Sequence, residues 1–126
     1  MDSDLRIRTA LIVEDDFLSA EYHKSLCGDL GIEVVGIASN PTEAITMIMK
    51  LRPQYILMDV RLEAKLDGVD VAHIIYREGL RPSVIYITGN NDNNTLLRIM
   101  TDHPHRILIK PTQPSQLEEA FSSGHP

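Results

Sequence analysis

The sequence has little of what secreted, membrane and nucleic-acid-binding proteins are built from. Its single cysteine, Cys27, excludes an internal disulfide and suits a reducing compartment. Apolar runs reach about five residues, far short of the ~20 that span a bilayer, and the N-terminal MDSDLRIR lacks the apolar core of a signal peptide. Only 12 Lys and Arg stand against 18 Asp and Glu, and the basic residues are scattered. We therefore expect a cytoplasmic protein without membrane or nucleic-acid partners.

The length is that of one compact domain. A chain of 126 residues that is 43% hydrophobic and 24% charged has the composition of a globular protein with a sizeable core. We expect the domain to span residues 8–121, with short terminal extensions at 1–7 and 122–126. Met1 and the polar ending SSGHP favour a stand-alone protein over a piece of a longer chain.

Five short segments have the continuous apolar, β-branched character of buried strands. They are residues 9–13, 33–38, 54–58, 83–88 and 106–109. Continuous apolar runs, in place of strict alternation, indicate strands that are covered on both faces, as in a parallel sheet. Gly36 weakens the second segment, so we expect that strand at an edge of the sheet.

Helical periodicity fills the segments between these strands. Apolar side chains recur every three or four residues, and cap residues precede four of the five stripes. The expected caps are Asp16, Asn40, Asp67 and Ser115. The stripes are Leu18, Tyr22, Leu26 and Leu30; Ala44, Ile48 and Leu51; Val71, Ala72 and Ile75; Leu96, Leu97 and Met100; and Leu117, Ala120 and Phe121.

The alternation of strands and helices predicts an α/β fold. Short connections imply right-handed crossovers, so the chain should form a doubly wound (βα)5 domain with a five-stranded parallel sheet and helices on both faces. In such open sheets, ligands bind beyond the carboxyl ends of the strands. The residues that follow the strands are therefore the candidates for a functional site.

Polar residues stand at the carboxyl ends of four of the predicted strands. They are Glu14, Asp15 and Asp16 after the first strand, Asp59 after the third, Thr88 after the fourth and Lys110 after the fifth. Carboxylates gathered at one edge repel each other by roughly 4 kcal/mol per pair at 4 Å, so the cluster needs a cation. Oxygen ligands in an open site suit Mg²⁺. With a cation and Lys110 present, a carboxylate there could act as a nucleophile and form an acyl phosphate.

Each of these residues also has a purely structural interpretation. A strand-end aspartate is often the N-cap of the next helix, which is the role we expect for Asp16. A Lys-Pro pair after a strand is commonly a turn with a solvated lysine, and Thr88 could simply begin a loop. Coincidence at four strand ends on the same edge is much less probable than any one of these, which favours the functional interpretation.

The motifs IVEDD, LMDVRL, ITG and LIKP, in this order and spacing, resemble the receiver domain of two-component response regulators. Asp15 precedes Asp59 by 44 residues, and Lys110 follows Asp59 by 51. The resemblance covers nearly the whole chain, from about Arg8 to Phe121. It implies the strand order 2-1-3-4-5 of the flavodoxin-like receiver fold.

The resemblance also implies a role for each of these residues. Asp59 would be the phosphoacceptor, Thr88 and Lys110 would bind the phosphoryl group, and the Lys110-Pro111 bond would be cis, as it often is in the family. The implied ligands of Mg²⁺ are Glu14, Asp15, Asp59 and the backbone carbonyl of Arg61.

The sequence departs from the common receiver pattern in two places. Gly68 comes one residue later than usual, and Ile107 stands where many relatives have the aromatic side chain that reports phosphorylation. An aliphatic side chain cannot report by an aromatic rotamer flip, which leaves the readout open. Arg61 and Asn90 occupy positions that tune the phosphoryl lifetime in the family.

The implied partners are a sensor histidine kinase or a histidine phosphotransfer protein, and a downstream protein at the face made by the fourth helix, fifth strand and fifth helix. The protein would catalyse only its own phosphorylation and dephosphorylation, so it would not be an enzyme in the usual sense. Alternatives are a receiver-like scaffold that works without phosphorylation and an excised receiver of a larger regulator. Arg61 stands where a haloacid dehalogenase phosphatase has its second aspartate, which argues against that enzyme, and the carboxylates after the first strand would repel a flavodoxin cofactor's phosphate.

Overall fold

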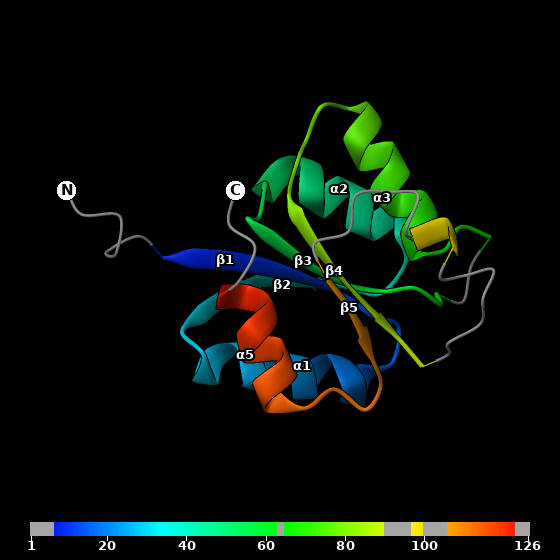
Figure 1. Cartoon of the computed structure of the whole chain (residues 1–126). Coiled ribbons are helices and arrows are strands. Elements are labelled where there is room, and N and C mark those ends of the chain that lie inside the picture. The colour runs from blue at the N-terminus through cyan, green and yellow to red at the C-terminus, as the bar shows by residue number, and fades with distance from the viewer. Residues whose placement is uncertain (1–6, 63–64, 90–96, 100–105, 123–126) are drawn as a thin grey trace.

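Five parallel strands form one sheet in the order β2-β1-β3-β4-β5 (Figure 1). The structure, a computed structural model, describes residues 7–62, 65–89, 97–99 and 106–122. Within these residues the strands are β1 (Arg8–Val13), β2 (Ile32–Ala38), β3 (Tyr55–Asp59), β4 (Ser83–Thr88) and β5 (Arg106–Ile109). The predicted doubly wound parallel sheet and its strand order are confirmed, and every strand begins and ends within one residue of its predicted bounds.

The burial of each strand follows its place in the sheet. All residues of the central strand β3 are buried, because helices cover both of its faces. Strand β2 lies at an edge and is only half-buried over most of its length, as Gly36 led us to expect. A Cβ atom at Gly36 would collide with the terminal methyl of Met47 in the covering helix, so a larger residue there would require the flexible Met47 side chain to move.

Helices cover the sheet as two layers. They are α1 (Phe17–Asp29), α2 (Pro41–Leu51), α3 (Gly68–Arg77) and α5 (Pro114–Ser122). Figure 1 shows α2 and α3 on one face of the sheet and α1 and α5 on the other. Each layer has its own apolar core: Leu11, Ile56, Met58 and Tyr86 face α2 and α3, whereas Ile12, Tyr55, Leu57 and Ile85 face α1 and α5.

The buried face of α1 differs from the predicted stripe. Leu18 and Tyr22 are 75% and 45% exposed, whereas Ala20, His23 and Cys27 are buried. A repeat of four residues drifts by about 40° per step against the 3.6-residue turn, so a long i, i+4 series winds around the helix. Leu26 is buried from that series, and the start of the series faces solvent. Leu51, the last residue of α2, is also 42% exposed, although it lies on the same side of the helix as the buried Ala44.

Three of the four predicted caps are present. The side chains of Asp16, Asn40 and Asp67 accept hydrogen bonds from the backbone N–H three residues later. Ser115 is not a cap, because α5 begins one residue earlier, at Pro114. There the carbonyl of Gln113 accepts the N–H of Leu117 and so begins the helix.

The predicted fourth helix lies largely outside the described residues, as do Leu96 and Met100. Residues 97–99 are helical; Leu97 is 63% exposed and Ile99 is fully buried. Arg98 donates hydrogen bonds to Asp67 at 2.6 and 3.3 Å and to Asp70 at 3.2 Å, which joins this segment to the start of α3. None of the described helices has the length and hydropathy needed to cross a bilayer.

Candidate functional site

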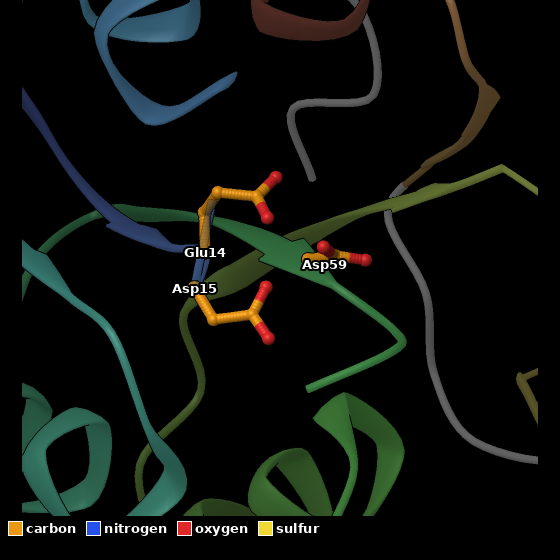
Figure 2. Close-up of side chains that lie close together, drawn as sticks. All are labelled: Glu14, Asp15 and Asp59. Atoms are coloured by element: carbon orange, nitrogen blue, oxygen red, sulfur yellow. The ribbon is translucent and has the colours of Figure 1, made fainter. Parts of the chain in front are cut away.

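The carboxyl ends of β1 and β3 bring Glu14, Asp15 and Asp59 together. Strands β1 and β3 pair in parallel with Val13 beside Met58, so the residues that follow these two lie side by side. Oxygen atoms of the three carboxylates lie within 4.8 Å of one another. Figure 2 shows Glu14 and Asp15 leaving the end of β1 on different sides, with Asp59 next to both at the end of β3. Oxygen donors so placed are the ligands that a hard divalent cation such as Mg²⁺ takes.

Lys110 contacts two of these carboxylates, those of Glu14 and Asp59. Its Nζ lies 3.3 Å from Glu14 Oε1 and 3.3 Å from Asp59 Oδ2. The lysine follows β5, its backbone N–H donates to the carbonyl of Thr88 at 2.8 Å, and the bond to Pro111 is cis, as the resemblance implied. Its side chain keeps 31% of its surface exposed, so an incoming group can still approach the ammonium.

Burial and mutual repulsion set the charges of the carboxylates. Glu14 and Asp59 are 4% and 6% exposed. Burial and the neighbouring Glu14 carboxylate raise the pKa of Asp59 to about 7. Burial also acts to raise the pKa of Glu14, but hydrogen bonds from the Asp59 carboxyl and the Asp16 backbone outweigh it and lower that pKa. Without a cation the pair therefore shares a proton below about pH 7, and Asp59 is the group whose pKa is raised.

The charge on Lys110 is held by the same two carboxylates. Burial acts to lower the pKa of its ammonium, but the charges of Asp59 and Glu14 outweigh burial and raise the pKa. The lysine is therefore a fixed positive charge at the mouth of an acidic site. Such a charge attracts anions and would stabilise phosphoryl oxygens bound beside Asp59.

The backbone around Asp59 is tightly fixed. The N–H of Arg61 donates to Asp59 Oδ1 at 3.1 Å, and the N–H of Gly68 donates to the carbonyl of Val60 at 2.9 Å. A Cβ atom at Gly68 would lie 2.5 Å from the carbonyl oxygen of Asp59 and 2.7 Å from Met58 Cγ. Gly68 therefore lets the start of α3 pack directly against the end of β3, a role that the sequence analysis did not foresee.

The other predicted residues take varied places. Thr88 is 2% exposed at the end of β4, next to Ile87, which is the register partner of Asp59. Ile107 is half-buried on β5 and packs against the core beneath α2 and α3. The side chain of Arg61 is exposed. Asn90 lies outside the described residues.

Two buried polar residues beside the site escaped the sequence analysis. His23 and Thr112 are 3% and 2% exposed, and His23 Nε2 lies 3.1 Å from Thr112 Oγ1. A cavity of about 350 Å³ lies next to them, between α1 and the turn after β5. Aligning Cys27 and Ala20 on a 3.6-residue period would have placed His23 on the buried face of α1.

Comparison with known proteins agrees with this geometry. A positive alginate biosynthesis regulatory protein of Pseudomonas aeruginosa is 35% identical over 116 residues, which are 90% of this chain and 46% of that protein. A transcriptional regulatory protein BtsR of Salmonella typhi is 29% identical over 88% of this chain and 45% of its own length. The chain thus spans about half the length of these curated relatives.

Solved structures share the fold over nearly the whole chain. The signal receiver domain of a modulated diguanylate cyclase from Desulfovibrio desulfuricans G20 is 32% identical, with a TM-score of 0.84 over 92% of this chain and 91% of that one. A family model described as the response regulator receiver domain matches residues 10–122. The chain therefore belongs to the family of response regulator receiver domains.

Proposed function

We propose that this receiver works in the cytoplasm as a phosphorylation-dependent switch that accepts a phosphoryl group on Asp59. One observation carries the proposal. Three carboxylates have oxygen atoms within 4.8 Å of one another, and the ammonium of Lys110 contacts two of them. A lone buried carboxylate could not serve, because its own charge would repel the donor's phosphate. A cation and Lys110 together remove that repulsion.

The donor in this proposal is a phosphohistidine on a sensor histidine kinase or phosphotransfer protein. A carboxylate oxygen of Asp59 attacks phosphorus, the phosphorus–nitrogen bond breaks, and the imidazole leaves with its bonding electrons and takes up a proton. Mg²⁺ held by Glu14, Asp15, Asp59 and the backbone carbonyl of Arg61 would neutralise the phosphoryl oxygens. Lys110 pairs with one of those oxygens and Thr88 donates a hydrogen bond to another. The protein turns over no separate substrate and catalyses only its own phosphorylation and dephosphorylation.

The start of α1 offers a docking surface for the donor protein. Phe17 and Leu18 are 72% and 75% exposed, directly after the acidic residues of the site. Two large apolar side chains so exposed next to a reactive group suit a protein partner more than a small molecule. Phosphotransfer from a protein donor should therefore fall about tenfold in Phe17→Ser, whereas phosphorylation by acetyl phosphate should be unchanged.

The downstream partner is proposed to bind the face made by the fourth helix, β5 and α5. Ile107 lies on this face and replaces the usual aromatic reporter, so the signal would pass by a backbone shift at Thr88 and Lys110. We also propose that Arg61 and Asn90 set the lifetime of the phosphoryl group. Arg61→Asn should then change the rate of dephosphorylation, and an unchanged rate would contradict that role.

The proposal is tested by labelling the wild-type protein with acetyl phosphate and Mg²⁺ and by transfer from candidate kinases. Intact-mass spectrometry should show one added phosphoryl group on the wild type and none on Asp59→Asn. Asp29→Asn, which changes an exposed carboxylate of α1, is the matched control and should label normally. If the wild type takes no label with either donor, the chain is better explained as a scaffold that binds partners without phosphorylation.

A further inference from the structure

A buried polar connection joins α1 to the turn that follows Lys110. His23 Nδ1 lies 2.8 Å from the carbonyl oxygen of Ser19, and His23 Nε2 lies 3.1 Å from Thr112 Oγ1. A carbonyl oxygen can only accept, so the hydrogen of the neutral ring is on Nδ1 and Nε2 accepts the hydroxyl of Thr112. Burial of His23 lowers the pKa of its ring, which favours this neutral form.

The neighbouring residue of α1 holds the same turn by its backbone. The hydroxyl of Tyr22 donates to the carbonyl of Thr112 at 2.7 Å, and the rings of Tyr22 and His23 meet edge to face at 5.3 Å between centroids. Thr112 is therefore bound through both its side chain and its backbone. At its other end the turn is fixed by the bond from the N–H of Lys110 to the carbonyl of Thr88.

Close packing does not hold this turn on the side that faces α1. A cavity of about 350 Å³ lies there, lined by Tyr22, His23, Lys110, Pro111 and Thr112 among others. Because this pocket is open to solvent, fewer side chains pack against the turn there, and its hydrogen bonds contribute more to its geometry. Burial of the polar groups of His23 and Thr112 also costs desolvation free energy. Two apolar side chains would fill the same space without that cost.

We propose that His23 and Tyr22 are positioning residues for Lys110. By holding Thr112, they fix the turn so that the Lys110 ammonium stays 3.3 Å from both Glu14 and Asp59. This inference rests on the proposed function, because Lys110 serves there to bind the phosphoryl group. Loss of the hydrogen bonds lets the turn move into the cavity and moves the ammonium away from the transferring group, and small displacements of this kind cost large factors in rate.

The test is the initial rate of Asp59 phosphorylation by acetyl phosphate and Mg²⁺, measured in two backgrounds. His23→Leu and Thr112→Val should each slow the reaction by about tenfold when Lys110 is present. In a Lys110→Met background, which should react more slowly than the wild type, the same changes should alter the rate by less than about twofold, because there is no ammonium left to position. Tyr22→Phe removes only a hydroxyl from a half-exposed residue, so it folds and should slow the reaction in the Lys110 background alone.

The possible outcomes separate the inference from the proposed function. Equal slowing in both backgrounds means a general structural role and overturns the inference, as does an unchanged rate in folded His23→Leu and Tyr22→Phe. Recovery of most of the rate in His23→Gln, whose amide oxygen can accept the Thr112 hydroxyl, supports it. A wild-type protein that takes no label at all overturns the proposed function, and the inference falls with it.

Discussion

Burial of the ionised Asp59 carboxylate destabilises the folded protein. Its carboxyl is 6% exposed, and burial together with Glu14 raises its pKa from 3.8 to about 7. Below pH 3.8 the group is protonated in both folded and unfolded chains, so folding carries no penalty there. Between pH 3.8 and 7 the unfolded chain releases a proton that the folded chain keeps, which favours unfolding more as the pH rises.

Asp59→Asn should therefore stabilise the metal-free protein at pH 8. We expect the free energy of unfolding to rise by roughly 2–4 kcal/mol, because the uncharged amide avoids the penalty of a buried charge. The gain should shrink as the pH is lowered from 7 towards 4, which urea titrations across this range would measure. Asp29→Asn on the exposed face of α1 is the control. A gain independent of pH would contradict the raised pKa.

At Gly68 the close approach of β3, and not a charge, limits which residue the fold accepts. Gly68→Ala should lower the free energy of unfolding by about 2–3 kcal/mol, since its Cβ atom would lie 2.5 Å from the carbonyl oxygen of Asp59. Gly28→Ala is the matched control, because a Cβ atom there meets nothing within 4 Å and α1 should gain about 0.5–1 kcal/mol. Thermal and urea unfolding of the two variants measure both effects. Equal stability of the two variants would show that α3 shifts to admit the methyl group.

At the scale of single elements, strands could be predicted from the sequence better than helix faces. Five mainly apolar runs gave strand bounds within one residue, because β3 is buried on both faces and the half-buried edge strands β2 and β5 are still mainly apolar. The face of α1 could not be read from Leu18 and Tyr22, since exposure there depends on what covers the helix. The site's carboxylates were predictable because parallel strands bring their carboxyl ends together. The contacts of His23 and Thr112 were not, because they join segments 89 residues apart.

Arg98 joins residues 97–99 to the start of α3, and Figure 1 shows this short yellow segment beside it. The Arg98 side chain is 45% exposed, so solvent weakens its ion pairs with Asp67 and Asp70. Arg98→Met should lower the free energy of unfolding by about 0.5–1 kcal/mol at low salt and by less at 1 M salt. Urea titrations at both salt concentrations check this, with Lys24→Met on the exposed face of α1 as the control. A loss that does not depend on salt would assign the effect to packing instead.

At the scale of the whole molecule, the three carboxylates at the ends of β1 and β3 form a site through which a divalent cation should stabilise the fold. Mg²⁺ that binds only the folded chain adds about 2.7 kcal/mol at a concentration 100 times its dissociation constant. Mg²⁺ should therefore raise the melting temperature of the wild type and much less that of Asp15→Asn. Asp16→Asn is the matched control, because asparagine caps α1 as well as aspartate does. Equal responses of the two variants to Mg²⁺ would place the cation elsewhere.

The separation of Glu14 and Lys110 by 96 residues has a consequence for synthesis on the ribosome. Strands β1 to β4 can pair without β5, which bonds only to β4 within the sheet. A nascent chain can thus form the acidic cluster before Lys110 has been added. Without the positive charge of that lysine, the carboxylates repel an incoming phosphoryl group. Competence for phosphorylation should arise only when the last strand has docked, so that an unfinished chain cannot be activated prematurely.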